Sequence, residues 1–144
     1  MRKQNLVKLG MAGMLLASPI LEAQAFTVTI DAGHGINTPG KRAVDDSFRE
    51  WQINDSVADY LQPMLESKGI TVYRVDDTTG QTDVSLNARL SRAINYGSNL
   101  HLSIHQNAVG GEWHEATGTE TYYSVLGSQA SQDLAKQVAN KMAE

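Results

Sequence analysis

The alternation of strand-like and helix-like segments constrains the fold of this chain most. Short β-rich segments at 26–30, 70–75 and 100–105 alternate with helical periodicity at 50–68 and 83–96. A Thr- and Tyr-rich segment at 118–124 predicts a fourth strand, and the pattern at 128–143 predicts a third helix. Strands that alternate with helices in this way predict an α/β domain, with a mostly parallel open sheet flanked by helices.

Glu50 is the most informative single residue, because it opens the first helix on its apolar side. Val57 and Leu61 follow on the same helix, and each projects within about 20° of Glu50 when every residue turns by about 100°. A carboxylate in a buried stripe is costly unless it is paired or bound to a metal. The alternative is a helix-start carboxylate that the helix dipole favours.

The residue pattern of the second predicted helix, at 83–96, indicates an apolar inner face and an ion pair close to it. Its side chains at Leu86, Leu90, Ala93 and Ile94 share one face, which we expect to pack inward. Arg89 lies near this face. We interpret it as a partner in a structural salt bridge rather than as a substrate contact.

Two histidines follow predicted strands. His34 lies between two glycines just after the first strand, and His105 ends the third. In open α/β sheets, ligands bind beyond the carboxyl ends of the strands, so we expect His34, His105 and Glu50 to meet there. Two histidines and a glutamate are a ligand set of catalytic zinc, with the fourth position left for water. Each histidine alone also fits a loop or core role, and we interpret His101 and His114 as structural or surface residues.

The first 25 residues have the composition of a secretory signal peptide. Basic residues within the first eight positions precede an apolar run at 9–21, which is too short for an ordinary membrane-spanning helix. Ala23-Gln24-Ala25 is a cleavage site of the small-x-small kind. We therefore expect an exported mature domain at 26–144, in the periplasm, in the cell wall or outside the cell. The alternative is an uncleaved membrane anchor.

Composition narrows the classes of partner and site. The formal net charge is −4, which argues against a nucleic-acid partner. The chain has no cysteine, so a disulfide framework and a thiolate zinc site are both excluded. A hydrophobic content of 41% is enough for the core of a single domain.

Three segments together resemble a known family. The run Asp31-Ala32-Gly33-His34-Gly35, Glu50 at a helix start, and Ser103-Ile104-His105-Gln106-Asn107-Ala108 are similar to zinc-dependent N-acetylmuramoyl-L-alanine amidases of the amidase-3 type. The similarity runs in order over about residues 27–143. The resemblance implies His34, Glu50 and His105 as zinc ligands and peptidoglycan as the substrate. The bond cut would be the amide between N-acetylmuramic acid and L-alanine.

One feature of the family has no counterpart in these residues. The family carries a second catalytic glutamate on a later strand, and Glu144 has a helical context that does not match its motif. We therefore expect the general base, and the last strand of the sheet, beyond Glu144. Glu120 is a weak candidate base, and Asn107 is a candidate for orienting substrate. The alternatives are an exported wall-binding module without catalysis, a zinc peptidase of related fold, and an α/β domain without metal.

Overall fold

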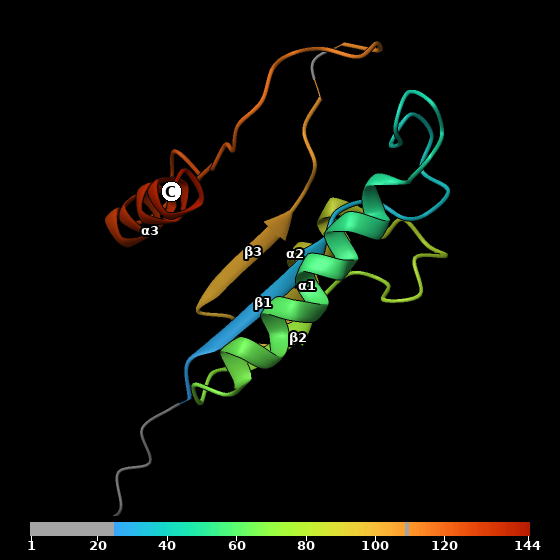
Figure 1. Cartoon of the computed structure of the whole chain (residues 1–144). Coiled ribbons are helices and arrows are strands. Elements are labelled where there is room, and N and C mark those ends of the chain that lie inside the picture. The colour runs from blue at the N-terminus through green and yellow to red at the C-terminus, as the bar shows by residue number, and fades with distance from the viewer. Residues whose placement is uncertain (1–24, 109) are drawn as a thin grey trace, which may run out of the picture.

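The fold is a small parallel sheet with helices on its two faces. A computed structural model describes residues 25–108 and 110–144, and its elements run β1 (Thr27–Ala32), α1 (Glu50–Glu66), β2 (Thr71–Arg74), α2 (Leu86–Asn95), β3 (Leu100–Ile104) and α3 (Gln129–Met142). The strands are ordered β2-β1-β3 and all pair in parallel. Figure 1 shows α1 in front of this sheet and α2 behind it. The α/β class predicted from the sequence is confirmed.

Strand β1 is the centre of the sheet and of the core. Val28, Ile30 and Ala32 point from it toward α1 and pack with Trp51 and Ala58. Parallel pairing places Ala32 opposite Ile104 of β3. The carboxyl ends of β1 and β3 therefore lie side by side at one edge of the sheet, where the next residues of both strands meet.

The inner face of α1 is rotated from the one that the apolar pattern predicts. Glu50 is buried as expected, but Val57 is 43% exposed. The buried positions after Glu50 include Asn54 and Ala58. Asn54 is buried because both ends of its amide are paired: Nδ2 donates to the Gly33 carbonyl at 3.1 Å, and Oδ1 accepts from Nε2 of Gln106 at 3.3 Å. The inner face thus includes the polar Asn54 rather than Val57, while Leu61 packs against the core as expected.

The prediction for the inner face of α2 holds for Ala93, which is buried, but is wrong for the three larger apolar residues. Leu86, Leu90 and Ile94 are 78%, 54% and 68% exposed, and the buried residues of this helix are Arg89 and Ala93. The sheet explains the reversal, because the face of β1 turned away from α1 carries polar side chains, including the buried Asp31. A polar surface is covered at least cost by a side chain that hydrogen-bonds to it, and Arg89 does so.

The predicted fourth strand at 118–124 does not form. These residues lie in the connection between β3 and α3, which leaves the sheet in Figure 1. Residues with a high strand propensity form a strand only where a neighbouring strand completes their backbone hydrogen bonds. No described strand pairs with this segment. The segment instead contacts α3, where Thr121 Oγ1 donates to the Ala135 carbonyl at 2.9 Å. Helix α3 forms as predicted but has no buried residue.

The N-terminal predictions lie at the border of the described residues. The predicted signal peptide occupies 1–25, and residues 1–24 are outside the part that the structure describes. Among the described helices, none combines the length and the apolar character that a membrane span requires.

Candidate metal centre

Three side chains from three elements meet at the carboxyl edge of the sheet. His34 follows β1, Glu50 begins α1 and His105 follows β3. Nε2 of His34 lies 3.4 Å from Oε1 of Glu50, and Nδ1 of His105 lies 3.1 Å from the same oxygen. The ring centroids of the two histidines are 4.8 Å apart and their planes are nearly perpendicular, at 84°. One nitrogen or oxygen from each residue lies within 4.8 Å of the others, so the group is able to hold a metal ion.

The separations of these atoms suit a tetrahedral ion. Zinc binds histidine nitrogen and carboxylate oxygen at about 2.0–2.2 Å, so two ligands of a tetrahedral site lie about 3.3 Å apart. The two distances to Oε1 of Glu50 are 3.4 and 3.1 Å. All three ligand atoms lie within 4.8 Å of one another, so an ion would draw them closer together, and the donor set leaves a fourth position open.

The turn after β1 is built around the His105 ring. Gly33 donates its N–H to the Ile104 carbonyl at 2.9 Å, which continues the pairing of β1 with β3 past the strand ends. A Cβ at Gly33 would lie 2.2 Å from Cε1 of His105, so only glycine leaves room for the ring. His34 itself has φ of 67°, in the left-handed region. The chain therefore reverses at once and directs His34 toward Glu50.

Glu50 is a buried carboxylate whose partners suit a metal ligand. It is 7% exposed, and Oε1 also accepts the backbone N–H of Gln106 at 3.1 Å. In the described part of the chain its ion-pair partners are His34 and His105, with no lysine or arginine among them. A buried carboxylate without a permanent cation is costly, and a bound cation would remove that cost.

The protonation states of this group also suit metal binding. Burial lowers the pKa of His34 below its ordinary value, although the charge of Glu50 opposes this shift. Burial alone would raise the pKa of Glu50, but hydrogen bonding from His105 and the nearby His34 outweigh it and lower the pKa. A neutral imidazole and an ionised carboxylate are the forms that bind zinc.

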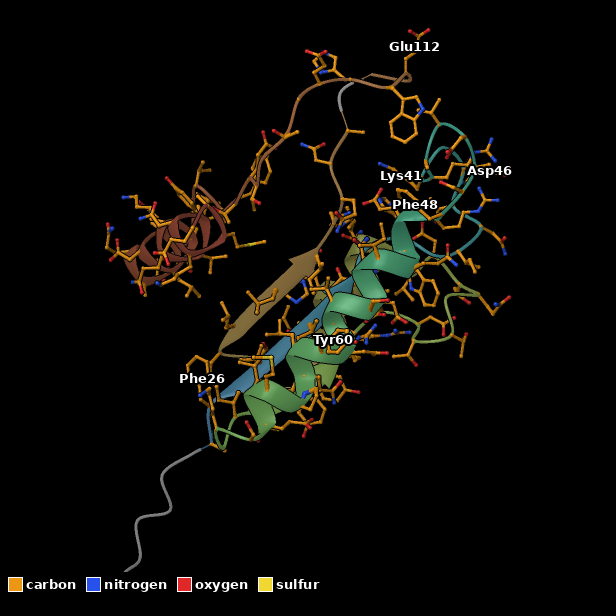
Figure 2. All side chains as sticks on the ribbon, viewed as in Figure 1. Phe26, Lys41, Asp46, Phe48, Tyr60 and Glu112 are labelled. Carbon is orange, nitrogen blue, oxygen red and sulfur yellow. The ribbon has the colours of Figure 1, made fainter. Side chains whose placement is uncertain are left out.

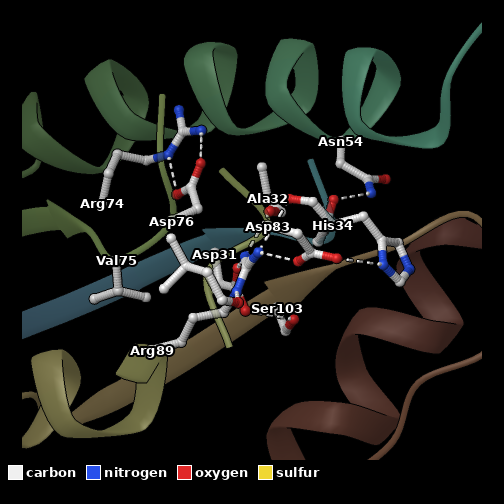
Figure 3. A network of polar contacts seen from close by, with 12 residues as sticks. Asp31, Ala32, His34, Asn54, Arg74, Val75, Asp76, Asp83, Arg89 and Ser103 are labelled. Carbon is white, nitrogen blue, oxygen red and sulfur yellow. Dashed lines mark hydrogen bonds and ion pairs between the residues drawn. The ribbon is translucent and has the colours of Figure 1, made fainter. Parts of the chain in front are cut away.

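Arg89 holds the turn that carries His34. Its guanidinium has five N–H donors, and all of them have acceptors: Nε donates to the Val84 carbonyl, Nη1 to Asp31 and the Ala32 carbonyl, and Nη2 to the His34 carbonyl and Asp83. Figure 3 shows Arg89 among these groups beneath the β1 turn. The side chain is buried, and Asp31 is fixed from its other oxygen by Ser103 at 3.0 Å. The predicted structural salt bridge of Arg89 is confirmed.

Two polar residues that the sequence analysis did not single out lie beside the ligand group, one next to His34 and one next to Glu50. Asp83 lies on the far side of the His34 ring, with Oδ2 3.9 Å from Nδ1, and receives a hydrogen bond from Thr38 at 2.8 Å. Figure 3 shows this carboxylate between Arg89 and the ring. Asn54, one turn after Glu50 on the same face of α1, links Gly33 to Gln106. The i, i+4 spacing from Glu50 was the available signal for Asn54, whereas Asp83 gave none.

Asn107 and Glu120 lie together, outside the ligand group. Nδ2 of Asn107 donates to Oε2 of Glu120 at 2.7 Å, and the hydroxyl of Tyr122 donates to the same oxygen at 2.6 Å. Both hydrogen bonds stabilise the carboxylate, with that of Tyr122 first, and they lower the pKa of Glu120. His101 contacts Thr29 at 3.0 Å, and exposed His114 accepts the Ala116 N–H at 2.9 Å. Neither of these histidines joins the ligand group.

A pocket of about 330 Å³ adjoins the two histidines. Its walls come from the turn after β1, the end of β3 and the start of α2, and they include Gly33, His34, His105, Asp83 and Leu86. A ligand in this pocket would therefore contact both histidine rings.

Comparison with known proteins agrees with this architecture. Residues 28–144 match the amidase-3 family, described as N-acetylmuramoyl-L-alanine amidase. The chain is 32% identical over 118 residues to the amidase LytC of Bacillus subtilis and 32% identical over 125 residues to a sporulation-specific amidase of the same organism. These alignments cover 81% and 78% of this chain but 23% and 48% of the relatives. The chain thus spans between about a quarter and a half of the length of these relatives.

Solved structures show the same fold. An N-acetylmuramoyl-L-alanine amidase from Clostridium difficile 630 superposes with a TM-score of 0.71 at 34% identity, covering 81% of this chain and 61% of that one. The catalytic domain of CwlV from Bacillus (Paenibacillus) polymyxa superposes with a TM-score of 0.68 at 29% identity, covering 80% and 63%. Because the family match covers most of the chain, and the fold of solved amidases agrees with it, this chain belongs to the amidase-3 family of N-acetylmuramoyl-L-alanine amidases.

Proposed function

We propose that this chain forms the zinc-binding part of a peptidoglycan amidase, with His34, Glu50 and His105 as the ligands. Its substrate would be peptidoglycan, and the bond cut would be the amide between N-acetylmuramic acid and L-alanine. The single observation that carries the proposal is the convergence of two imidazole nitrogens on one buried carboxylate oxygen, at 3.4 and 3.1 Å. Membership of the amidase family supplies the class of substrate.

The residues of this chain would hold and orient the reacting groups. Bound zinc supplies a Lewis acid that polarises the scissile carbonyl and makes a water acidic enough to react near neutral pH. Oε1 of Glu50 is aimed by the N–H of Gln106, and Asn54 ties Gln106 to the turn that presents His34. The substrate amide would enter the pocket beside the two histidine rings.

Proton transfer needs a general base, and Glu120 is only a weak candidate for that role. A general base must take the water proton and pass it to the leaving amine, and its pKa is best near the working pH. Hydrogen bonds from Tyr122 and Asn107 lower the pKa of Glu120, so it is a poor proton acceptor. We therefore keep the proposal that the base is the glutamate that the family carries on a later strand.

Zinc content and amidase activity of matched variants test the ligand assignment. Purified full-length protein is expected to hold one zinc ion per chain and to expose new L-alanine amino termini on sacculi. His34→Ala and His105→Ala should each lose zinc and activity, because each removes one ligand. His114→Ala, which changes an exposed histidine outside the group, should keep both. Full zinc content in both ligand variants would overturn the assignment.

The same preparation separates the rival functions. Release of amino groups from plain peptides, but not from muropeptides, would indicate a zinc peptidase. Co-sedimentation of the full-length protein with sacculi without any release of amino groups would indicate a wall-binding module. Each outcome contradicts the amidase proposal in its own way.

We also propose that the protein is exported, because peptidoglycan lies outside the cytoplasm and the first 25 residues have the composition of a signal peptide. Cleavage after Ala25 would give a mature chain that begins at Phe26, just before β1. N-terminal sequencing of protein from the producing cell checks this. A cytoplasmic product that keeps Met1 would contradict it.

A further inference from the structure

The connection between β1 and α1 forms a short hairpin at the metal centre. Arg42 and Arg49 pair as an antiparallel bridge, and Ala43 donates its N–H to the Phe48 carbonyl at 3.0 Å. The last bond of the hairpin runs from the N–H of Glu50 to the Lys41 carbonyl at 2.9 Å. We call residues 41–50 the 41–50 hairpin. Because it ends on Glu50, its side chains have a fixed position relative to the ligand group.

Two arginines of this hairpin converge on a single carboxylate. Nη1 of Arg42 lies 3.3 Å from Oδ1 of Asp46, and Arg49 pairs with both oxygens of the same group, Nη2 at 3.5 Å from Oδ2. In the described residues, Asp46 is the partner of both guanidiniums in every ion pair they form. One carboxylate therefore faces two cations. The site therefore has the geometry to hold a carboxylate, and with the neighbouring Asp45 the two guanidiniums and Asp46 carry no net formal charge. Figure 2 shows Asp46 beyond the start of α1, together with Lys41 and Phe48.

The arginine pair lines a pocket next to the metal centre. The pocket has a volume of about 250 Å³, and besides Arg42 and Arg49 it is lined by residues 36–40, which follow His34 almost directly. Thr38 in its wall accepts the Gly35 N–H at 2.9 Å and donates to Asp83, which lines the pocket beside His34. The two pockets thus share the Thr38–Asp83 contact as a wall. Whole-ligand pockets usually start at about 300 Å³, so this smaller one suits one part of a ligand.

We propose that Arg42 and Arg49 form a subsite for a carboxylate of the peptide stem, next to the amide that would be cut. This proposal rests on the proposed amidase function and names the group that the enzyme recognises beyond L-alanine. The residue after L-alanine in a peptidoglycan stem is a glutamate linked through its side chain, so its α-carboxylate is free or amidated. An extended peptide advances about 3.3–3.6 Å per residue, so this carboxylate lies within about two residue lengths of the amide that would be cut. Guanidinium groups bind carboxylates through paired hydrogen bonds, which fixes orientation as well as charge.

Selectivity between two matched substrates tests the subsite. Both substrates are muramyl dipeptides whose γ-carboxyl is capped as a methylamide: MurNAc-L-Ala-D-isoglutamate then carries only the free α-carboxylate on its glutamate, and MurNAc-L-Ala-D-isoglutamine carries an amide in its place. A charged hydrogen bond contributes about 1.5–3 kcal/mol, so the zinc-loaded full-length protein should show a KM about tenfold or more lower for the acid, with similar kcat. Arg42→Gln and Arg49→Gln should each bring the ratio of the two KM values toward one. Lys68→Gln, which removes an exposed cation just beyond the opposite end of α1, should leave the ratio unchanged.

The outcomes separate the subsite from the amidase proposal. An equal KM for acid and amide in the wild type, or an unchanged ratio in both arginine variants with normal circular dichroism, would overturn the subsite. If neither substrate is cut, the amidase proposal has failed, and calorimetric titration with the same two compounds then decides about the subsite. Tighter binding of the acid, lost in Arg42→Gln, would support it. Equal binding of acid and amide would refute it. Arg42 lies outside α1, so its variant tests the idea even where Arg49→Gln disturbs the helix start.

Discussion

Arg89→Met is expected to reduce the free energy of unfolding by about 3–5 kcal/mol, the usual cost of removing one partner from a buried ion pair. Methionine keeps much of the length of the side chain but removes every donor. Asp31, which is 2% exposed, would keep only the hydrogen bond from Ser103 at 3.0 Å. The carbonyls of Ala32 and His34 would lose partners at 2.7 and 3.0 Å.

The cost is large compared with the stability of a domain of this size, which is typically about 5–15 kcal/mol. Urea unfolding followed by circular dichroism measures it. With a slope of about 2 kcal/mol per molar urea, a loss of about 4 kcal/mol lowers the midpoint by about 2 M. Arg42→Met is the matched control, because its pair with Asp46 is exposed and such pairs contribute about 0–1 kcal/mol.

A double variant distinguishes an unpaired buried charge from a simple loss of packing. In Arg89→Met combined with Asp31→Asn, the second change removes the charge that the first leaves without a partner. The double variant should therefore cost clearly less than the sum of the two single ones. A loss below about 1 kcal/mol for Arg89→Met, or costs that simply add, would refute the view that this ion pair fixes the β1 turn.

Three further results are expected. Gly33→Ala puts a Cβ 2.2 Å from the His105 ring and should weaken zinc binding by about 10–100-fold in a competition assay, whereas Gly111→Ala, in open space, should not. Asp83→Asn should weaken zinc binding by about tenfold or more, because it removes the charge facing Nδ1 of His34; unchanged affinity would contradict this role. Metal-free protein should lose stability as the pH falls below about 6.5. The pKa of His34 is lowered in the folded state, so unfolding takes up a proton in this range. The urea midpoint of His34→Gln should therefore depend less on pH than that of the wild type.

Sequence reasoning predicted the elements that are defined by local pattern. The strands that carry the two histidines and the helix that begins at Glu50 form where the pattern placed them. The burial of Glu50 was also predictable, because helical geometry alone puts it on the side of Leu61. The structure brings both histidines to this carboxylate, as the rule for parallel sheets indicated.

The failed predictions depended on what lies opposite a segment. The pattern of α2 favoured Leu90 as an inner residue, but the facing strand offers the carboxylate of Asp31, and Arg89 turns inward to meet it. Thr29 and Asp31 alternate with Val28 and Ile30, so the sequence pattern already indicated that one face of β1 is polar. The segment 118–124 has strand composition, but composition does not supply a neighbour for it. The spacing from Glu50 indicates the face of α1 on which Asn54 lies, but the sequence does not indicate its partner, the distant carbonyl of Gly33.

The central place of β1 has a consequence for the order of folding. Thr29 pairs with His101 of β3, and Asp31 with Ser103, so the register between these strands closes a loop of about seventy residues. Helix α1 needs only local contacts to begin, whereas this loop must lose much of its chain entropy before the strands gain any pairing energy. His34 and His105 are carried by the two partners of that late pairing. We therefore expect the metal ligands to come together in the slow, long-range step of folding. An ion that binds them would stabilise the sheet after it has formed rather than nucleate its folding.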